Sequence, residues 1–327
     1  MVTFKQVARS YASAVKAAER DKKRHARETA RLYKEQQKQQ EIADVAEIVK
    51  LYEEYIDVLM SIHKSCTDKI DWQQVLDDPE PPHPEKQTTN ETAAKQKLEN
   101  YKPSFFDKMF GSKKKVQALE TAVEQSKAQD QKDFETAQQT YKDWEVTQTI
   151  AKGVQSKDTK AYADTIKYFE PFSDISELGS NMQISFNTDF IEIEFQVNNS
   201  EVIPNYVVSQ TKTGKLSKKD MPKGKFNELY QDYVCGGLLR VARETLAYLP
   251  VKMVAIHAMA EMVNSSTGHL ELVPIVSAII PSETMEKLNF ETLDPSDSMQ
   301  NFVHNMKFSK TNGFSQVDKV DIKGKIK

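Results

Sequence analysis

The lysine-rich stretch from residue 212 to residue 225 is the segment best suited to bind phosphate. Asp220 is its only acidic residue. A loop that leads into a helix N-terminus can bind phosphate through free backbone amides and the helix dipole. Thr213-Gly214-Lys215 lacks the first glycine and the spacing of a P-loop, so the stretch predicts a general anion-binding surface or, as the alternative, a solubilising loop. Its lysines are Lys212, Lys215, Lys218, Lys219, Lys223 and Lys225.

A second basic segment lies near the start of the chain. Residues 1–40 hold 11 basic and 4 acidic side chains, whereas residues 41–57 hold one basic and six acidic side chains. Closely spaced cations release counterions from nucleic-acid phosphates without any contact to the bases. The basic segment therefore predicts a nucleic-acid surface or, as the alternative, a solvated helix surface. The predicted contact residues are Lys22, Lys23, Arg24, Arg27 and Arg31.

Two carboxylates stand two residues apart at Glu192 and Glu194, which places both on one face of a strand. A nuclease that holds its metal with an acid-x-lysine triplet would need a lysine at one of these positions, and neither is lysine. Residues 321–323 have the required spacing but fall in an expected tail. The pair is either a solvated strand face or an acidic site completed by the lysine-rich stretch.

Two histidines with nearby glutamates raise the question of a metal site. In a hairpin that bends at Asn264, His257 lies roughly 23 Å from the bend, at about 3.3 Å per residue, while His269 lies beside it. The two cannot share one ion, so no metal site is predicted. We expect His257 to be a hydrogen-bonded core histidine. His304 is expected in the last helix without a matching partner.

The two cysteines, Cys66 and Cys235, are far apart and have no second cysteine or metal-spaced histidine beside them. They predict a reducing, cytoplasmic environment instead of a disulfide framework or a zinc site. No signal-like apolar region opens the chain, and no run of 18 apolar residues occurs. Aromatic residues within 105–110, followed by lysines at 113–115, suit a membrane surface or packing on a neighbouring helix, and we expect the packing.

The first half of the chain is predicted to be helical. Only 39% of the residues are hydrophobic and the mean hydropathy is -0.63, which favours exposed helices over one large core. A series of residues follows the alternating steps of three and four that define a coiled-coil seam. These residues are Val45, Val49, Tyr52, Ile56, Leu59 and His63. They predict one helix from Phe4 to about Ile70.

Four prolines between residues 79 and 84 interrupt this helical pattern. They predict an irregular excursion over about 77–112, before a second helix at about 113–156. Two long helices joined in this way are expected to form an antiparallel coiled-coil hairpin, which makes residues 1–170 the first domain. The basic segment has too few apolar side chains to be held by the hairpin alone. A second copy or another partner is therefore expected to contact it.

The second half, residues 171–327, is predicted to be an α/β domain. Alternating apolar residues at 184–186 and 191–195 predict two strands, and residues 206–208 a third. Residues 226–249 follow the helical period and predict the core helix. The apolar runs 251–263 and 270–280 predict a buried β-hairpin. Short helices are expected at Ser282 and from Asp294 to about Met306, and residues 319–327 are expected to be frayed.

Together these patterns predict a two-part α+β protein: a helical hairpin followed by a mixed α/β domain with a mostly antiparallel sheet and one central core helix. The leading functional hypothesis is an intracellular interaction or scaffold protein that forms homo-oligomers or binds a protein through the hairpin and nucleic acid through its basic surfaces. The alternative is a metal-dependent nuclease or nucleotide-processing subunit with its site in the second domain. No cofactor is predicted, no catalytic residue is assigned, and a membrane surface is not the expected partner.

Overall fold

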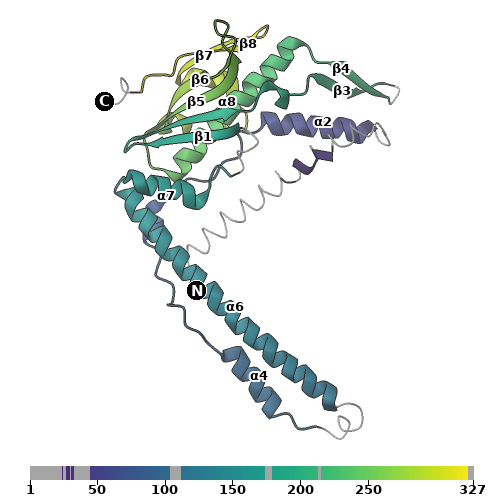
Figure 1. The fold of residues 1–327 in the computed structure, drawn as a ribbon, viewed down its shortest axis with the longest axis vertical. Helices are drawn as coiled ribbons and strands as arrows, with labels where there is room; N and C mark the ends of the chain where they lie inside the picture. The colour runs from purple at the N-terminus through teal and green to yellow at the C-terminus, as the bar shows by residue number, and fades with distance from the viewer. Residues whose placement is uncertain are drawn as a thin grey trace. The chain divides into compact units, whose positions relative to one another are not determined.

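The computed structural model describes residues 24, 27–29, 31–32, 45–103, 112–173, 179–212 and 215–322 (Figure 1). The chain has an α+β fold with long helices and a mixed β-sheet. It divides into two compact units: Met1–Trp72 with Gly153–Lys327, which we call the sheet unit, and Gln73–Lys152, which we call the helical unit. This division does not follow the expected boundary at residue 170, because residues 45–72 pack with the sheet.

The helical unit is built around α6 (Ser112–Gln155), which confirms the predicted second helix. The expected irregular excursion contains another helix, α4 (Thr89–Glu99), which lies antiparallel to α6. Asp130 of α6 accepts hydrogen bonds from the backbone amides of Asn90 and Glu91 at 3.1 and 2.8 Å. These bonds satisfy amides in the first turn of α4, and they lower the pKa of the Asp130 carboxyl.

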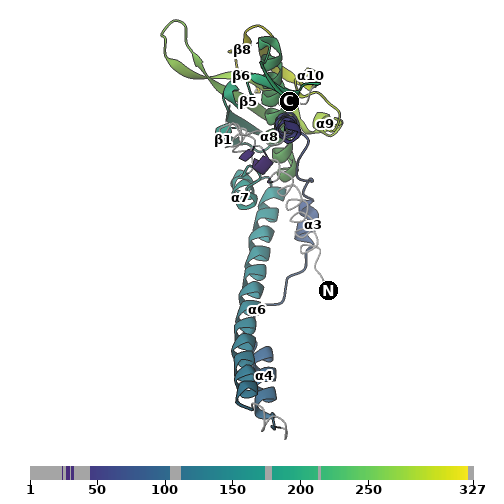
Figure 2. The same cartoon turned by 90° about the vertical axis from the view of Figure 1, so that its right-hand side faces the viewer.

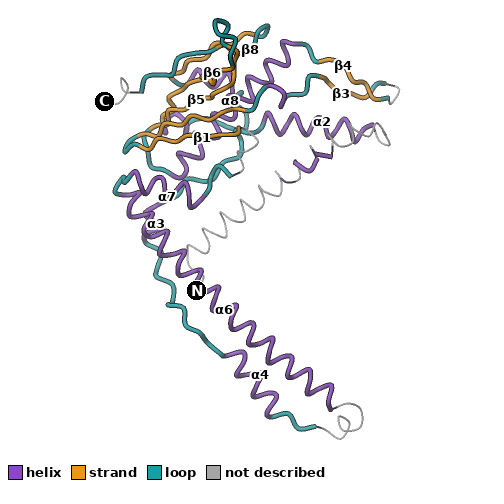
Figure 3. The backbone as a smooth tube through the Cα atoms, viewed as in Figure 1, coloured by secondary structure: helices purple, strands orange, loops and turns teal. Residues whose placement is uncertain are grey.

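An extended segment connects α3 (Trp72–Leu76) to α4 and follows α6 along its length (Figure 3). Trp144 donates its indole N–H to the carbonyl of Asp78 at 3.1 Å, and Tyr141 donates its hydroxyl to Glu80 at 2.7 Å. Prolines suit this position because an extended chain beside a helix needs no ladder of amide donors. Within the helical unit, α6 therefore packs against residues 77–99, and the predicted coiled coil with an N-terminal helix is not confirmed.

The first helix of the sheet unit with described bounds is α2 (Val45–Met60). Its buried residues Ile48, Leu51 and Tyr52 pack on the β3–β4 hairpin. The prediction that the helix continues to Ile70 is wrong, because α2 ends at Met60 and the following residues cross α8 as irregular chain. This crossing is fixed by backbone contacts, including the Ile70 amide, which donates to Ala247 at 2.8 Å. Most of residues 1–44 lie outside the described residues.

A six-stranded sheet forms the centre of the sheet unit, in the order β1-β2-β5-β6-β7-β8. The predicted strands are confirmed as β1 (Gly179–Phe186), β2 (Phe190–Val197), β5 (Met253–Val263) and β6 (Leu270–Pro281). Strands β2 and β5 run parallel, and the other neighbours are antiparallel. The predicted core helix is confirmed as α8 (Lys223–Tyr248), which packs on β2 and β5 (Figures 1 and 2).

The end of the chain differs from its prediction. Asp294 caps α10 (Pro295–Ser298) as expected, accepting from the amide of Asp297 at 3.0 Å. The helix then stops. A 3-10 turn, η3 (Met299–Asn301), leads into β7 (Val303–Ser309) and β8 (Gly313–Ser315), so His304 lies in a strand. Pairing with the open edge of β6, where Ile279 lies opposite Val303, outweighs the helical signal of the cap.

The segment that follows β8 is described as far as residue 322, and residues 319–322 lie on the sheet, contrary to the expected fraying. Residues 323–327 lie outside the described residues. The described segment crosses the sheet face opposite α8. The Val317 amide donates to Pro274, and the Val320 amide donates to the hydroxyl of Ser277 at 2.8 Å. Ile322 is buried against Ala255 and Ile279. These contacts give the second sheet face its own apolar cover.

The remaining elements connect the sheet to its surroundings. Helix α7 (Thr159–Phe169) is capped by Asp158 and packs closely on the end of α6, where a Cβ atom on Gly153 would lie 2.4 Å from the Cβ of Ala161. Only glycine fits there. A short turn, η2 (Ser200–Val202), follows β2, and α9 (Ser282–Met285) confirms the predicted helix at Ser282. No helix in the described part of the chain has the length and apolar character of a transmembrane span.

Candidate functional site

The lysine-rich stretch covers part of a β-hairpin and the first turn of α8. Strands β3 (Tyr206–Gln210) and β4 (Leu216–Asp220) pair in a two-stranded sheet of their own. The expectation of a loop here is therefore wrong for Lys218 and Lys219, which lie in β4. We call β3, β4, their turn and residues 221–225 the lysine hairpin.

All six lysines of the lysine hairpin are exposed: Lys212, Lys215, Lys218, Lys219, Lys223 and Lys225. Within the described residues, none of these ammonium groups forms an ion pair. Six positive charges stand against the single negative charge of Asp220, which gives residues 212–225 a net charge of +5. A rigid ribbon with this charge attracts polyanions over about one Debye length, ~8–10 Å at physiological salt.

A small apolar core holds the lysine hairpin on α2. Val208 is buried against Ile48, Leu51 and Tyr52. The Tyr52 hydroxyl donates to the carbonyl of Tyr206 at 2.9 Å, and burial raises the pKa of this phenol. The hydroxyl of Tyr55 donates to Val202 at 2.7 Å, just before the hairpin. These bonds fix the base of the hairpin, so that its lysines are displayed from a positioned backbone.

Two further features of the lysine hairpin favour anions. The ammonium group of Lys218 lies 3.7 Å from the centre of the Tyr206 ring, which leaves an aromatic and a cation together on the surface. Helix α8 begins after Pro222 without any side-chain cap, so the positive end of its dipole adds to the charges of Lys223 and Lys225. The arrangement can bind phosphate groups.

The N-terminal basic segment is described only in part. Lys22 and Lys23 lie outside the described residues. Arg24 and Arg31 are exposed, and Arg27 is half-buried. The aromatic residues at 105–110, which were expected to pack on a helix, also lie outside the described residues. The predicted nucleic-acid surface at the start of the chain therefore stays a prediction.

The two strand glutamates have partners inside the protein. His257 is fully buried and lies between them and β6: its Nε2 is 3.2 Å from Glu192 Oε1, and its Nδ1 is 2.8 Å from the hydroxyl of Ser277. Burial lowers the pKa of His257. The predicted core histidine is confirmed. Glu194 pairs at 2.5 Å with Lys319, from the segment expected to be frayed.

The described residues contain no group of three or more histidine, cysteine or acidic side chains placed to hold a metal ion. The lysine that reaches the strand glutamates is Lys319 and not one from the lysine hairpin. Asp321 and Ile322 follow it on the sheet, where Ile322 is buried and so belongs to the apolar cover. The geometry around Glu192 and Glu194 is that of a half-exposed polar network whose carboxylates contact His257 and Lys319.

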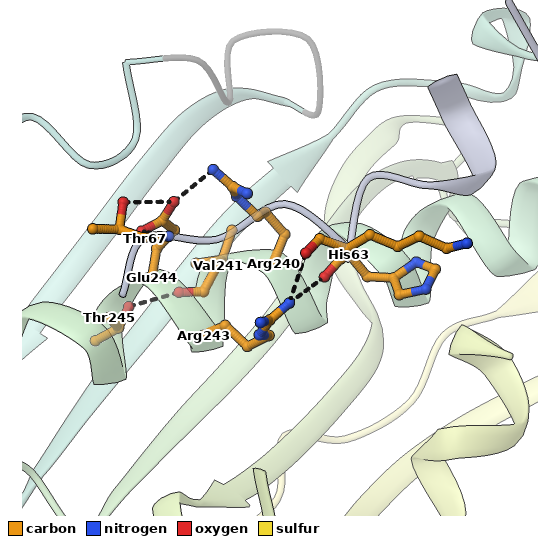
Figure 4. Close-up of polar contacts among 8 residues, drawn as sticks. His63, Thr67, Arg240, Val241, Arg243, Glu244 and Thr245 are labelled. Carbon is orange, nitrogen blue, oxygen red and sulfur yellow. Dashed lines mark hydrogen bonds and ion pairs between the residues drawn. The ribbon is translucent and has the colours of Figure 1, made fainter. Parts of the chain in front are cut away.

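A buried ion pair on α8 was not predicted from the sequence. Arg240 and Glu244 are 5% and 2% exposed, and their side chains meet at 2.5 Å (Figure 4). Glu244 also accepts weak hydrogen bonds from the amide and hydroxyl of Thr67. Arg243, three residues after Arg240, donates to the carbonyl of His63 at 2.7 Å. The only signal in the sequence is the spacing of four between an arginine and a glutamate in a core helix.

The sequence also gave no sign of a groove of about 650 Å³ where β2 ends. It is lined by the turn after β2, by the first turns of α8 and by the outer half of β5. Asn227 and Tyr230 of α8 form part of its wall.

No known protein family, curated protein or solved structure matches this chain. The argument for function therefore depends on the geometry of its surfaces.

Proposed function

We propose that the protein is an interaction protein that binds a polyanion, nucleic acid in the first place, through the lysine hairpin. The observation that carries this proposal is the set of six exposed lysines that form no ion pair within the described residues. A single surface lysine has little effect on the free energy of unfolding, wherever it lies. Six lysines on one short ribbon repel one another, and that repulsion is relieved when an anion binds.

Nucleic acid suits the lysine hairpin better than a single phosphate does. The cationic groups extend from the hairpin turn at Lys212 and Lys215 to the start of α8 at Lys225, and a polymer can contact all of them at once. Each phosphate that a lysine neutralises releases condensed counterions, so affinity should fall steeply with salt. The ring of Tyr206 holds the ammonium group of Lys218 above it, which keeps this charge in a defined place on the hairpin.

The first prediction concerns this salt dependence. If all six lysines contact the phosphates of a single strand, the slope of log K against log salt should approach about -4. Replacing Lys212, Lys215, Lys218 and Lys219 by glutamine should reduce the steepness of that slope by about 3 and weaken binding at least 100-fold at low salt. Gel shift or fluorescence anisotropy with a labelled single-stranded 20-mer over a salt series measures both quantities.

A matched control removes the same charge elsewhere. Lys127, Lys132, Lys142 and Lys152 are exposed on α6, and their replacement by glutamine changes the net charge equally. This control should bind as the unmodified protein does. Failure of the unmodified protein to bind at low salt, or equal losses in the two variants, would contradict the proposal. Replacing Arg24, Arg27 and Arg31 in the same assay tests whether the N-terminal basic segment extends the surface.

The enzymatic alternative has weaker geometric support. A nuclease centre needs carboxylates that are free to bind a metal, whereas Glu192 contacts His257 and Glu194 pairs with Lys319. We therefore propose binding and not catalysis as the function. An intracellular setting suits Cys66 and Cys235, neither of which is in a disulfide.

We further propose that the helical unit carries contacts to a second copy or to a protein partner. Helix α6 has 44 residues, and residues 77–99 cover only one stripe of it, which leaves a long helical surface for association. Light scattering over a range of concentrations should give a native mass above the 37.3 kDa of one chain. A mass of one chain at every concentration would contradict self-association and leave only a different protein as partner.

A further inference from the structure

Strand β5 is longer than the strand beside it. Its parallel pairing with β2 runs from Phe190 opposite Met253 to Gln196 opposite Met259, and β2 ends at the next residue. The pairing of β5 with β6 on its other side continues to Val263 opposite Leu270. Residues 260–263 are therefore paired on one side only. No described strand lies at the position that a longer β2 would fill.

The direction of the backbone groups on β5 follows from the hairpin turn. Asn264 donates its amide to His269 across the hairpin at 2.9 Å. Because successive residues of a strand turn their N–H and C=O groups to opposite sides, those of Glu261 and Val263 face away from β6. No residue of β2 lies opposite either of them, because the parallel pairing ends at Gln196 opposite Met259. Both residues are exposed, so these groups are open to another strand.

The groove of about 650 Å³ lies beside this free edge. Its walls are held in place by hydrogen bonds: the Tyr230 hydroxyl donates to the Asn198 carbonyl at 2.9 Å, and the side-chain amide of Asn227 donates to Lys310 at 2.7 Å. Burial raises the pKa of Tyr230 to about 12, so the phenol stays a neutral donor. The groove is thus a formed site and needs no rearrangement to admit a ligand.

The chemistry of the groove is that of amides, aromatics and carboxylates. Asn198, Asn227 and Phe314 line it together with Tyr230. Its only charged lining residue besides Glu261 is Glu201, and it has no basic lining residue. A neutral or basic ligand is favoured over an acidic one.

The opposite face of the same hairpin end is apolar and exposed. Val263 and Leu270 are each 65% exposed, and Leu272 is 49% exposed. Val263 pairs with Leu270, and Glu261 pairs with Leu272, so the three apolar side chains share one face with the side chain of Glu261. We call them the hairpin patch. Large apolar side chains in such a group commonly mark a place where another chain binds.

We propose that an extended segment of a partner protein, neutral or basic in charge, adds as a strand to the free edge of β5 at Glu261–Val263. Its backbone would bond to the open N–H and C=O groups of those two residues, as in other cases of strand addition. Alternate side chains then point to opposite faces: one set enters the amide and aromatic groove, and the other covers the hairpin patch. This site is independent of the lysine hairpin, which binds anions.

The test uses the full chain and synthetic peptides. The basic probe is a labelled, capped peptide of sequence Lys-Val-Thr-Val-Lys-Val-Thr, and the acidic probe replaces each lysine with glutamate. Fluorescence anisotropy should show at least 10-fold tighter binding of the basic probe. Hydrogen exchange should show slower exchange of the Glu261 and Val263 amides when this probe is bound, with no change along β1, which lies at one edge of the sheet.

Two variants separate backbone from charge. Glu261→Pro removes an N–H beyond the last registered pair of β2 and β5, and an edge position tolerates proline. It should weaken the basic probe at least 10-fold. Glu261→Gln keeps the N–H and should lose only a few-fold. Equal binding to Glu261→Pro, no binding of either peptide, or protection of β1 in place of β5 would overturn the proposal. If Glu261→Pro does not fold, the exchange experiment on the unmodified protein still decides it.

Discussion

Replacing Glu244 by alanine is expected to lower the free energy of unfolding of the sheet unit by about 3–5 kcal/mol. The substitution leaves Arg240 charged and almost fully buried, with the Nη1 atom of the guanidinium already lacking a partner among the described residues. A buried charge without a counter-ion costs far more than the lost attraction alone. Glu244 also links α8 to Thr67, so the crossing chain after α2 should loosen as well.

Urea unfolding followed by circular dichroism measures this loss, and two further variants give it meaning. Lys50 and Glu54 form a pair with the same spacing on α2, but they are 72% and 40% exposed. Glu54→Ala should cost less than about 0.5 kcal/mol. Replacing Arg240 and Glu244 together by leucine should recover most of the loss, because no buried charge remains. Similar costs for Glu244→Ala and Glu54→Ala would show that the buried pair behaves like a surface pair.

Lowering the pH from 7 to 6 is expected to destabilise the sheet unit through His63 and His257. Both are almost fully buried, and burial is the main cause that lowers the pKa of each. The unfolded chain therefore binds more protons than the folded chain at a pH below the ordinary histidine pKa of about 6.5. The stability contributed by neutral histidine is complete above that pH and is lost as the pH falls below it, by up to about 1.4 kcal/mol per pH unit for each histidine.

The charges around each histidine modify this effect without reversing it. Lys64 and Arg243 lower the pKa of His63 further, while Asp294 and the backbone of Phe290 raise it. For His257, Lys319 acts in the same direction as burial. Glu192, through its hydrogen bond and its charge, and Glu194 act against it.

One carboxyl group opposes the histidines at lower pH. Burial, with the nearby charges of Asp294, Asp297 and Glu228, raises the pKa of Asp232 to about 6. The folded chain therefore takes up a proton at this carboxyl before the unfolded chain does, and this contribution stabilises the fold as the pH falls from about 6 to about 4. The loss should therefore begin near pH 6.5, and Asp232 should offset part of it below about pH 6.

Urea unfolding at intervals between pH 7.5 and 5 checks the balance between these groups. His63→Leu should flatten the loss between pH 7 and 6, whereas Asp232→Asn should leave that range unchanged and steepen the loss below it. Stability that is constant or rises as the pH falls from 7 to 6 would contradict the assignment.

Local patterns predicted those elements of the fold that depend on neighbours in sequence. The apolar period of α8 and the alternation in β1 and β2 are local, and both were read correctly. The failures come from competition between distant segments. Residues 303–309 alternate between exposed and half-buried positions, which is a strand pattern. The cap at Asp294 favours a helix over the same residues, and the pairing with β6 decides for the strand. Likewise, α2 stops where the next residues bind α8 by their backbone, which no local signal announces.

The candidate sites show the same division. The lysines of the hairpin are visible in the sequence because their type and density carry the chemistry. The contact of Glu192 with His257 depends on the parallel pairing of β2 with β5, and strands so far apart in sequence cannot be paired from their patterns. The free edge at Glu261 arises because β2 is shorter than β5 at that end, which only the register reveals.

The helical unit occupies residues 73–152, so the chain leaves the sheet unit after Trp72 and re-enters it at Gly153. These two points are close together, because Trp72 and Val154 line the same cavity of about 530 Å³ within the sheet unit. In evolutionary terms, this is the layout of a module inserted into a host domain. Such a module can be gained, shortened or exchanged by a genetic change at one place while the strand order of the host stays the same.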